Sequence, residues 1–488
     1  MKKKYITKLM IAACLSSALS LNSCIEEVFP ESSTATIDQI GKSDQAISAM
    51  VNSVVAFINA FRSYGPQFYH DFGYSGYNLI RESACEDFFC HEPKFDFFDT
   101  YGVCNDLGDA DVVNTIWYYN YKFLNNVNNA LSALEKADDA PENKYYKGIC
   151  LSYRAMIYMD LVRMYEYKKT GVEKLDAEAA SKNLYGITVP IITAETTEEE
   201  GRNNPRAPFY AVYKFILDDL ASAEELLSDY QRPTKNLPCT PVVHGLMARM
   251  WLEMGSRFEL YPEDLNTLNN NTDLNIASKE TCFTKAAEYA RKVINESGAM
   301  PLTEKEWFGG DSYTTGFNSV LTNSWVWGSI MTTEDVHSYW LNFAGSMCPE
   351  QTFGYGNRKW QGYKLIGRKL FDQIPNADWR KTTWIAPEDA GKAPGTKYHT
   401  LFTDENFKKV PAYVHLKFKL KEGNMIDANV GAPIDNLLMR VEEMYFIEAE
   451  AIAASQGGKR WNFCFGEFYE NLSLQFLPMY GICYGRFS

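Results

Sequence analysis

Apolar residues recur at helical spacing through the middle of the chain. Between 113 and 136 they fall three, four and seven positions apart, as one face of a helix requires. This stripe consists of Ile116, Phe123, Val127, Ala130 and Leu134. After a turn at 138–143, a second apolar stripe consists of Tyr146, Cys150, Tyr153, Ile157, Leu161 and Met164. Two amphipathic helices joined by a short turn predict an αα-hairpin.

The same unit recurs later in the chain. An apolar stripe over 209–227 follows Pro208, a residue that suits a first helical turn. Further helices are predicted at 243–254 and 283–294. Hairpins of roughly 34 residues cannot bury their apolar faces alone and stack into a tetratricopeptide-like solenoid. We therefore predict a mainly α fold of tetratricopeptide-like helical hairpins, with long loop-rich excursions and a few short strands.

Three long tracts show no sustained helical period. Residues 62–112, 296–364 and 375–436 are rich in Gly, Asn, Asp and aromatic residues. Loops of this length in a compact domain are usually functional or ordered by packing. Short strands are plausible at Trp325–Ile330 and Tyr413–Leu420. We expect one large domain over residues 45–455.

The first residues have the order of a secretory signal peptide. Four lysines among the first eight residues precede an apolar stretch at 9–21 and then small residues before Cys24. About 13 apolar residues are too few to span a bilayer as a helix, which needs roughly 20. The ending Leu21-Asn22-Ser23-Cys24 resembles the bacterial lipobox. We expect residues 1–23 to be removed, Cys24 to carry lipid, and residues 24–44 to form a tether.

Charge and cysteine content narrow the choice of partners. The formal charge is −14, and it becomes −18 without residues 1–23, which hold four lysines and no acid. Nucleic acid and other polyanions are therefore disfavoured as ligands. The cluster of Cys85, Cys90 and Cys104 with His91 matches no usual zinc spacing. We expect buried thiols or one local disulfide, and neither a metal nor a cofactor.

Five motifs stand in a fixed order along the chain. They are Trp117–Tyr121 running into 128–131, Tyr153–Tyr165, Gly186–Ile191, Ala248–Leu252 and Met439–Ala451. The second is similar to a helix of the form RAxxYxDLVRxYG. Together with the lipobox, their order and spacing resemble the SusD/RagB family of lipoproteins, the surface glycan-capture component of Bacteroidetes nutrient uptake. The resemblance covers nearly all of residues 1–454.

This resemblance implies an outer-membrane lipoprotein exposed at the cell surface. It would hold oligosaccharide on aromatic platforms and act as a lid on a TonB-dependent, SusC-like transporter. The charged residues of the motifs have a simpler interpretation as fold markers. We expect Arg154, Asp160 and Arg163 to form packing or ion-pair contacts. We expect the glutamates to be solvated or paired with neighbours such as Arg440; they are Glu442, Glu443, Glu448 and Glu450.

The end of the chain departs from the family pattern. Nine of the 28 residues 461–488 are aromatic, without any periodicity that would bury them. Family members usually continue with further loops and a helix that resembles ERxxEL. We expect residues 456–488 to be an atypical tail, produced by truncation or by a change of reading frame.

Two loop tracts have the composition of a sugar site. A sugar ring packs its C–H face on Trp or Tyr, and its hydroxyls need donors and acceptors nearby. Aromatic residues make up 14% of the chain, although most of them must be core. The ligand-binding candidates are Tyr77, Arg81, Tyr101, Tyr313, Trp340 and Trp360.

Two other functions remain open. A glycosidase needs two positioned carboxylates, and no local motif selects a pair among the 62 acids. A serine hydrolase is also poorly supported, because no Gly-x-Ser-x-Gly occurs. We therefore expect no enzyme and no catalytic residues. A helical-repeat scaffold that binds only protein partners is the main alternative to a glycan-binding protein.

Overall fold

The computed structural model describes residues 36–61, 71–85, 87–91, 111–337, 340–357, 359 and 362–456 of the chain, with side chains at 111 and 112 left out. Cys24, Tyr101, Trp360 and the tail from 457 lie outside these residues. The predictions of lipidation at Cys24 and of an atypical tail therefore stay predictions.

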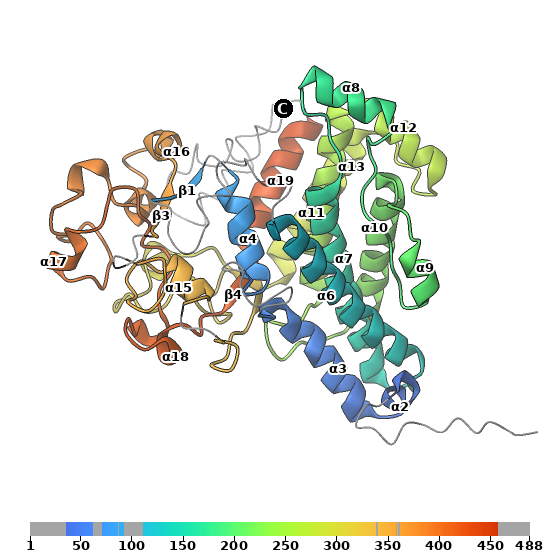
Figure 1. The fold of residues 1–488 in the computed structure, drawn as a ribbon, viewed down its shortest axis with the longest axis horizontal. Helices are drawn as coiled ribbons and strands as arrows, with labels where there is room; N and C mark the ends of the chain where they lie inside the picture. Colours follow the sequence, from blue (N-terminus) through green and yellow to red (C-terminus); the bar gives the residue numbers. More distant parts are fainter. Residues whose placement is uncertain are drawn as a thin grey trace, which may run out of the picture.

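The described part is mainly helical (Figure 1). The α-helices are α2 (Ile37–Gly41), α3 (Asp44–Ala56), α4 (Tyr74–Ser83), α6 (Asp111–Glu135), α7 (Pro141–Tyr165), α8 (Glu173–Ser181), α9 (Glu198–Arg202), α10 (Phe209–Leu226), α11 (Thr240–Leu260), α12 (Pro262–Asn271), α13 (Lys279–Glu296), α14 (Glu304–Trp307), α15 (Phe343–Met347), α16 (Arg368–Gln373), α17 (Asp404–Phe407), α18 (Ala428–Gly431) and α19 (Val441–Ser455). The 3-10 helices are η1 (Phe57–Asn59), η2 (Trp379–Thr383), η3 (Pro387–Asp389) and η4 (Lys421–Gly423), and the strands are β1 (Phe88–Cys90), β2 (Trp325–Ser329), β3 (Lys364–Ile366) and β4 (Asn436–Arg440).

Long helices pack side by side in one half of the molecule (Figure 1). Helix α7 packs against both α6 and α10, and α13 packs against both α11 and α19. The predicted helices at 113–136, 209–227, 243–254 and 283–294 are confirmed as α6, α10, α11 and α13. The turn after α6 leads into α7 through Pro141 in its first turn, where a missing N–H costs nothing. The prediction of a mainly α fold of helical hairpins is confirmed.

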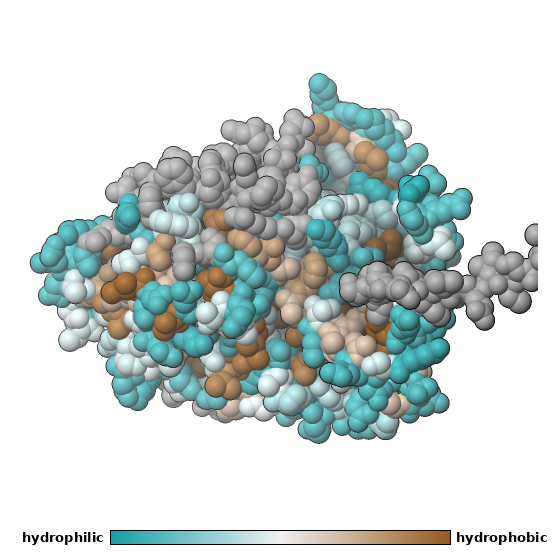
Figure 2. Space-filling model, turned by 60° about the horizontal axis from the view of Figure 1, so that its bottom comes forward, coloured by the Kyte–Doolittle hydropathy of each residue, from teal (hydrophilic) through white to brown (hydrophobic). Residues whose placement is uncertain are grey.

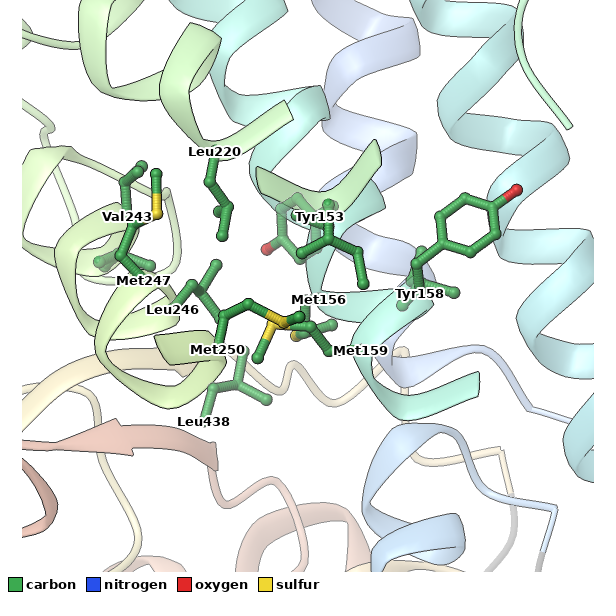
Figure 3. Packing of buried hydrophobic residues seen from close by; sticks show 14 of the residues in the cluster. Tyr153, Met156, Tyr158, Met159, Leu220, Val243, Leu246, Met247, Met250 and Leu438 are labelled. Atoms are coloured by element: carbon green, nitrogen blue, oxygen red, sulfur yellow. The ribbon is translucent and has the colours of Figure 1, made fainter. Parts of the chain in front are cut away.

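The core of this half lies between α7, α10 and α11 (Figure 3). Every residue of α7 from 148 to 162 is buried, so this helix is covered on all sides and not along one stripe. Glycine lets neighbouring elements approach closely: a Cβ at Gly245 of α11 would overlap the Met439 sulfur of β4. The apolar stripe in the sequence therefore understates how deeply α7 is buried.

The motif charges form ion pairs between helices. Arg154 of α7 pairs with Asp219 of α10 at 2.7 Å, and Arg291 of α13 pairs with Glu448 of α19 at 2.6 Å. Glu443 binds Arg249 of α11. These contacts confirm the interpretation of these charges as fold markers, although Arg154 itself is 8% exposed and lies inside the protein.

The other half of the molecule is the loop region, residues 297–440, together with β1, and α4 lies between this half and the long helices (Figure 1). Its two small antiparallel sheets pair β1 with β3 and β2 with β4. The strand predicted at Trp325–Ile330 is confirmed as β2. The strand predicted at Tyr413–Leu420 is wrong: this segment is extended but forms only isolated bridges at Val414 and His415. Ile366 and residues 383–385 form backbone hydrogen bonds with it only between Tyr413 and Leu416, so no continuous ladder forms among the described residues.

Two segments predicted as irregular are helical. The tract that begins at Tyr74 is α4, which starts after Gly73 at φ +83° and buries Tyr77 and Ile80 on its inner face. Helix α2 lies inside the predicted tether, where Thr36 forms a capping box with Gln39. Packing of the chain therefore begins before Asp44.

No helix in the described ranges is long and apolar enough to cross a membrane. The described cysteines are all free thiols, and Cys150, Cys239, Cys282 and Cys348 are buried.

Candidate functional site

Trp340 and Tyr355 form an aromatic pair at the surface of the loop region. Their ring centroids are 5.5 Å apart and their planes are inclined by 32°. Trp340 is 39% exposed, whereas Trp325 and Trp327 of β2 are completely buried. Apolar surface is visible in patches over this half of the molecule (Figure 2). Trp340 therefore offers a flat apolar surface to solvent.

The backbone behind this pair is tightly packed. The N–H of Gly356 donates to the carbonyl of Gly345 in α15 at 2.8 Å, and a Cβ at Gly356 would overlap the carbonyl of Ser346. The side chain of Asn342 caps α15 by accepting from the N–H of Gly345 at 2.7 Å. Only glycine allows two segments to approach this closely. The surface pair is thus held by a rigid support.

Tyr313 lies in a second, partly exposed aromatic group. Its backbone has φ +55°, which is unusual for a bulky residue. Its ring meets the edge of His399 at 5.2 Å, and His399 stacks on Phe308 at 4.3 Å. Burial lowers the pKa of His399, which favours the neutral imidazole. In this group the partly exposed Tyr313 ring is supported by His399 and Phe308.

Arg81 is fixed by a buried carboxylate. Its guanidinium donates to Asp160 of α7 at 2.8 Å, and the Tyr74 hydroxyl donates to the other oxygen at 2.6 Å. Burial opposes the charge on Asp160, but Arg81 and Arg163 outweigh it and hold the pKa of Asp160 below its usual value. The Arg81 side chain is 34% exposed. It therefore has N–H donors left for a ligand while its position is set by Asp160.

Tyr77 lies in the core and not on the surface. It is 4% exposed, its hydroxyl donates to Asp71 at 2.9 Å, and its ring lies 4.4 Å from Tyr119. Any effect of Tyr77 on a ligand would be indirect. Tyr101 and Trp360 lie outside the described residues, so their roles stay predictions.

The structure brings Tyr313 beside His399, a residue that the sequence did not single out. The two are far apart in the chain, and no local pattern links them. Asp160, which positions Arg81, was recognised only as a packing residue. The described residues contain no group of three His, Cys, Asp or Glu side chains that would hold a metal ion.

Comparison with known proteins shows which known fold this chain resembles. Residues 48–252 match the family model SusD-like_3, described as starch-binding and associating with the outer membrane. A SusD-like carbohydrate-binding protein from Bacteroides vulgatus superimposes with a TM-score of 0.63 at 19% identity, over 90% of this chain and 77% of that one. The chain has the SusD-like fold.

Other solved structures agree with this SusD-like fold. A laminarin-binding SusD-like protein gives a TM-score of 0.57 at 14% identity, over 90% of this chain and 86% of that one. A SusD superfamily protein from Bacteroides thetaiotaomicron gives a TM-score of 0.57 at 15% identity, over 87% of this chain and 79% of that one. No curated protein sequence matches the chain.

The residues matched by the family model and the aromatic surfaces lie in different parts of this chain. The matched residues run from α3 into α11, so they cover the helical scaffold. Trp340, Tyr355 and Tyr313 all lie beyond them in the loop region. The scaffold carries the family resemblance, and the loops carry the candidate site.

Proposed function

We propose that this protein is a cell-surface glycan-binding lipoprotein that captures oligosaccharide and delivers it to a partner SusC-like, TonB-dependent transporter in the outer membrane. The family description supports carbohydrate binding and association with the outer membrane. The exposed Trp340 ring on its rigid support is the observation that carries the proposal. In this proposal Cys24 carries the lipid anchor, and the protein is not an enzyme.

Exposed and partly exposed side chains of this protein can supply both kinds of contact that a sugar needs. Trp340 and Tyr355 offer ring faces for C–H groups, and Arg81 and Tyr313 offer polar atoms for hydroxyls. The ring faces need no conformational change to bind, because Gly345 and Gly356 fix the backbone behind them. A preorganised surface loses less entropy on binding.

Calorimetry with a panel of oligosaccharides from laminarin and starch tests the proposal. Trp340→Ala should weaken binding of the best ligand at least tenfold, or about 1.4 kcal/mol, without a change in melting temperature. Tyr118→Ala is the matched control, because Tyr118 is 44% exposed but lies on α6 among the long helices. Equal affinity of both variants would remove Trp340 from the site. If no glycan of the panel binds, the scaffold that binds only protein is favoured.

A separate experiment tests the anchor. Cys24→Ala should move the protein from the membrane fraction to the soluble fraction, because acyl chains supply the membrane affinity. A variant that stays in the membrane fraction would contradict lipidation at Cys24.

A further inference from the structure

The ammonium group of Lys417 lies among three aromatic rings of the loop region. The Nζ atom is 4.4 Å from the ring centroid of Phe317, and 5.4 Å from those of Trp307 and Phe418. Within the described part of the chain, this nitrogen has no hydrogen-bond or ion-pair partner. The side chain is half-buried, so solvent reaches it but does not surround it.

A second cation shares the same rings. The guanidinium carbon of Arg440 lies 5.1 Å from the centroid of Phe317 and 5.8 Å from that of Trp307. Each ring attracts a cation, but two cations on the same two rings repel each other in a place with little water. The arrangement therefore disfavours the charged form of Lys417.

The acidic groups that face Lys417 do not restore its charge. Glu442 of α19 accepts from the backbone N–H of Leu302 at 3.1 Å and lies 3.9 Å from Arg440. The charge of Glu82 of α4 raises the pKa of Lys417 less than that of Glu442 does. Burial is the largest effect on Lys417, and Arg440 adds to it; together they lower its pKa to about 7.

Two basic residues of the same extended segment complete the surroundings. Burial and the nearby lysines lower the pKa of His415 to about 3, so its ring carries no charge at neutral pH. Lys419 donates to the carbonyl of His399 at 2.9 Å and lies 3.6 Å from Glu350. Neither residue offers Lys417 a negative partner.

We propose that Lys417 is a reactive-amine site that takes short hydroxyaldehydes as imines. A lysine that is desolvated and next to another cation is an activated nucleophile. Its lone pair attacks the aldehyde carbon, and the carbonyl oxygen takes up the proton that nitrogen loses. The carbinolamine then releases water, and a carbon–nitrogen double bond replaces the carbon–oxygen one.

The surroundings favour a hydroxyaldehyde over a purely apolar aldehyde. Arg440 Nη1 and Glu442 Oε2 are both buried without a hydrogen-bond partner in the described structure. One is a donor and the other an acceptor, so a hydroxyl next to the aldehyde carbon satisfies both. Trp307 and Phe317 provide apolar walls for the carbon chain.

Reductive trapping of glycolaldehyde on the full chain tests this site. With cyanoborohydride at pH 7, peptide mass mapping should show Lys417 modified at least tenfold faster than the exposed Lys392 and Lys421, since an ordinary lysine has a pKa of about 10.4. The rate at Lys417 should reach half its maximum near pH 7. A rate that keeps rising to pH 10, or one no faster than at the exposed lysines, would overturn the proposal.

Two variants separate this site from general lysine chemistry. Arg440→Gln removes the neighbouring cation and should slow trapping at pH 7 severalfold by moving the half-maximal pH of trapping upward. Lys421→Arg, at an exposed position nearby, should leave trapping at Lys417 unchanged. An Arg440→Gln protein that traps as fast as the parent at pH 7 would contradict the role of Arg440. The pH profile of the parent protein stands as a test even if this variant fails to fold.

Discussion

The guanidinium of Arg154 donates two hydrogen bonds, of 2.8 and 2.7 Å, to the carboxylate of Asp219 in the buried contact between α7 and α10. A third N–H of Arg154 donates to Asn128 of α6 at 3.1 Å. One side chain thus joins three neighbouring helices. Asp219 is 5% exposed, so each charge depends on the other for compensation.

We expect Asp219→Asn to lower the free energy of unfolding by about 3–5 kcal/mol, because it leaves the Arg154 charge buried without its counter-ion. Urea unfolding followed by circular dichroism measures this change. The matched control is Glu198→Gln, which breaks the Arg202–Glu198 pair with side chains 74% and 82% exposed. It should cost less than about 1 kcal/mol. Similar losses in both variants would show that burial of the first pair does not matter.

His415 should make the protein less stable in mild acid. Burial, together with Lys417, Lys419 and Lys364, lowers its pKa to about 3, whereas an unfolded histidine titrates near 6.5. Between these values only the unfolded state takes up the proton. The contribution to stability is therefore complete above pH 6.5 and is lost as the pH falls toward 3, at up to about 1.4 kcal/mol per pH unit.

Comparing variants isolates this effect from that of the carboxylates. The free energy of unfolding of His415→Gln should fall less steeply between pH 6 and pH 4 than that of the parent protein. His337→Gln is the control, since His337 is exposed. Parallel pH profiles of the parent and His415→Gln would contradict the assignment.

Gly356→Ala should displace the backbone that supports the Trp340–Tyr355 ring pair. The added methyl group meets the carbonyl of Ser346, so the Gly345–Gly356 hydrogen bond must break or shift. We expect a loss of about 1–3 kcal/mol and a changed near-ultraviolet circular dichroism signal from Trp340 and Tyr355. Gly201→Ala in α9 has open space around it and should be neutral or slightly stabilising. An unchanged spectrum of Gly356→Ala would show that the backbone contact does not position the rings.

The long helices were predictable because their apolar spacing is local. The stripe from Ile116 to Leu134 and the turn before Pro141 identify α6 and α7 without any tertiary information. Helix α4 was missed because Gly76 and the polar residues near it weaken the pattern, and only packing of Tyr77 and Ile80 reveals its inner face. The candidate site was harder to predict from the sequence than α4. Exposure separates Trp340 from the buried Trp325 and Trp327, and exposure depends on contacts distant in the chain.

Arg81 allows a positioning role to be separated from contact with a ligand. Arg81→Gln should lower the free energy of unfolding by about 1–2 kcal/mol, since the buried Asp160 carboxylate loses the hydrogen bond and the charge of Arg81. In Arg81→Gln/Asp160→Asn the buried charge is gone as well, and stability should recover in part.

Glycan affinity then distinguishes the two roles of Arg81. If the guanidinium donates to the ligand, calorimetric affinity stays at least fivefold weaker in the double variant even though stability recovers. If Arg81 acts only by pairing with Asp160, affinity and stability recover together. Asp160→Asn alone serves as the matched control, because it keeps the guanidinium and removes only the charge that holds it.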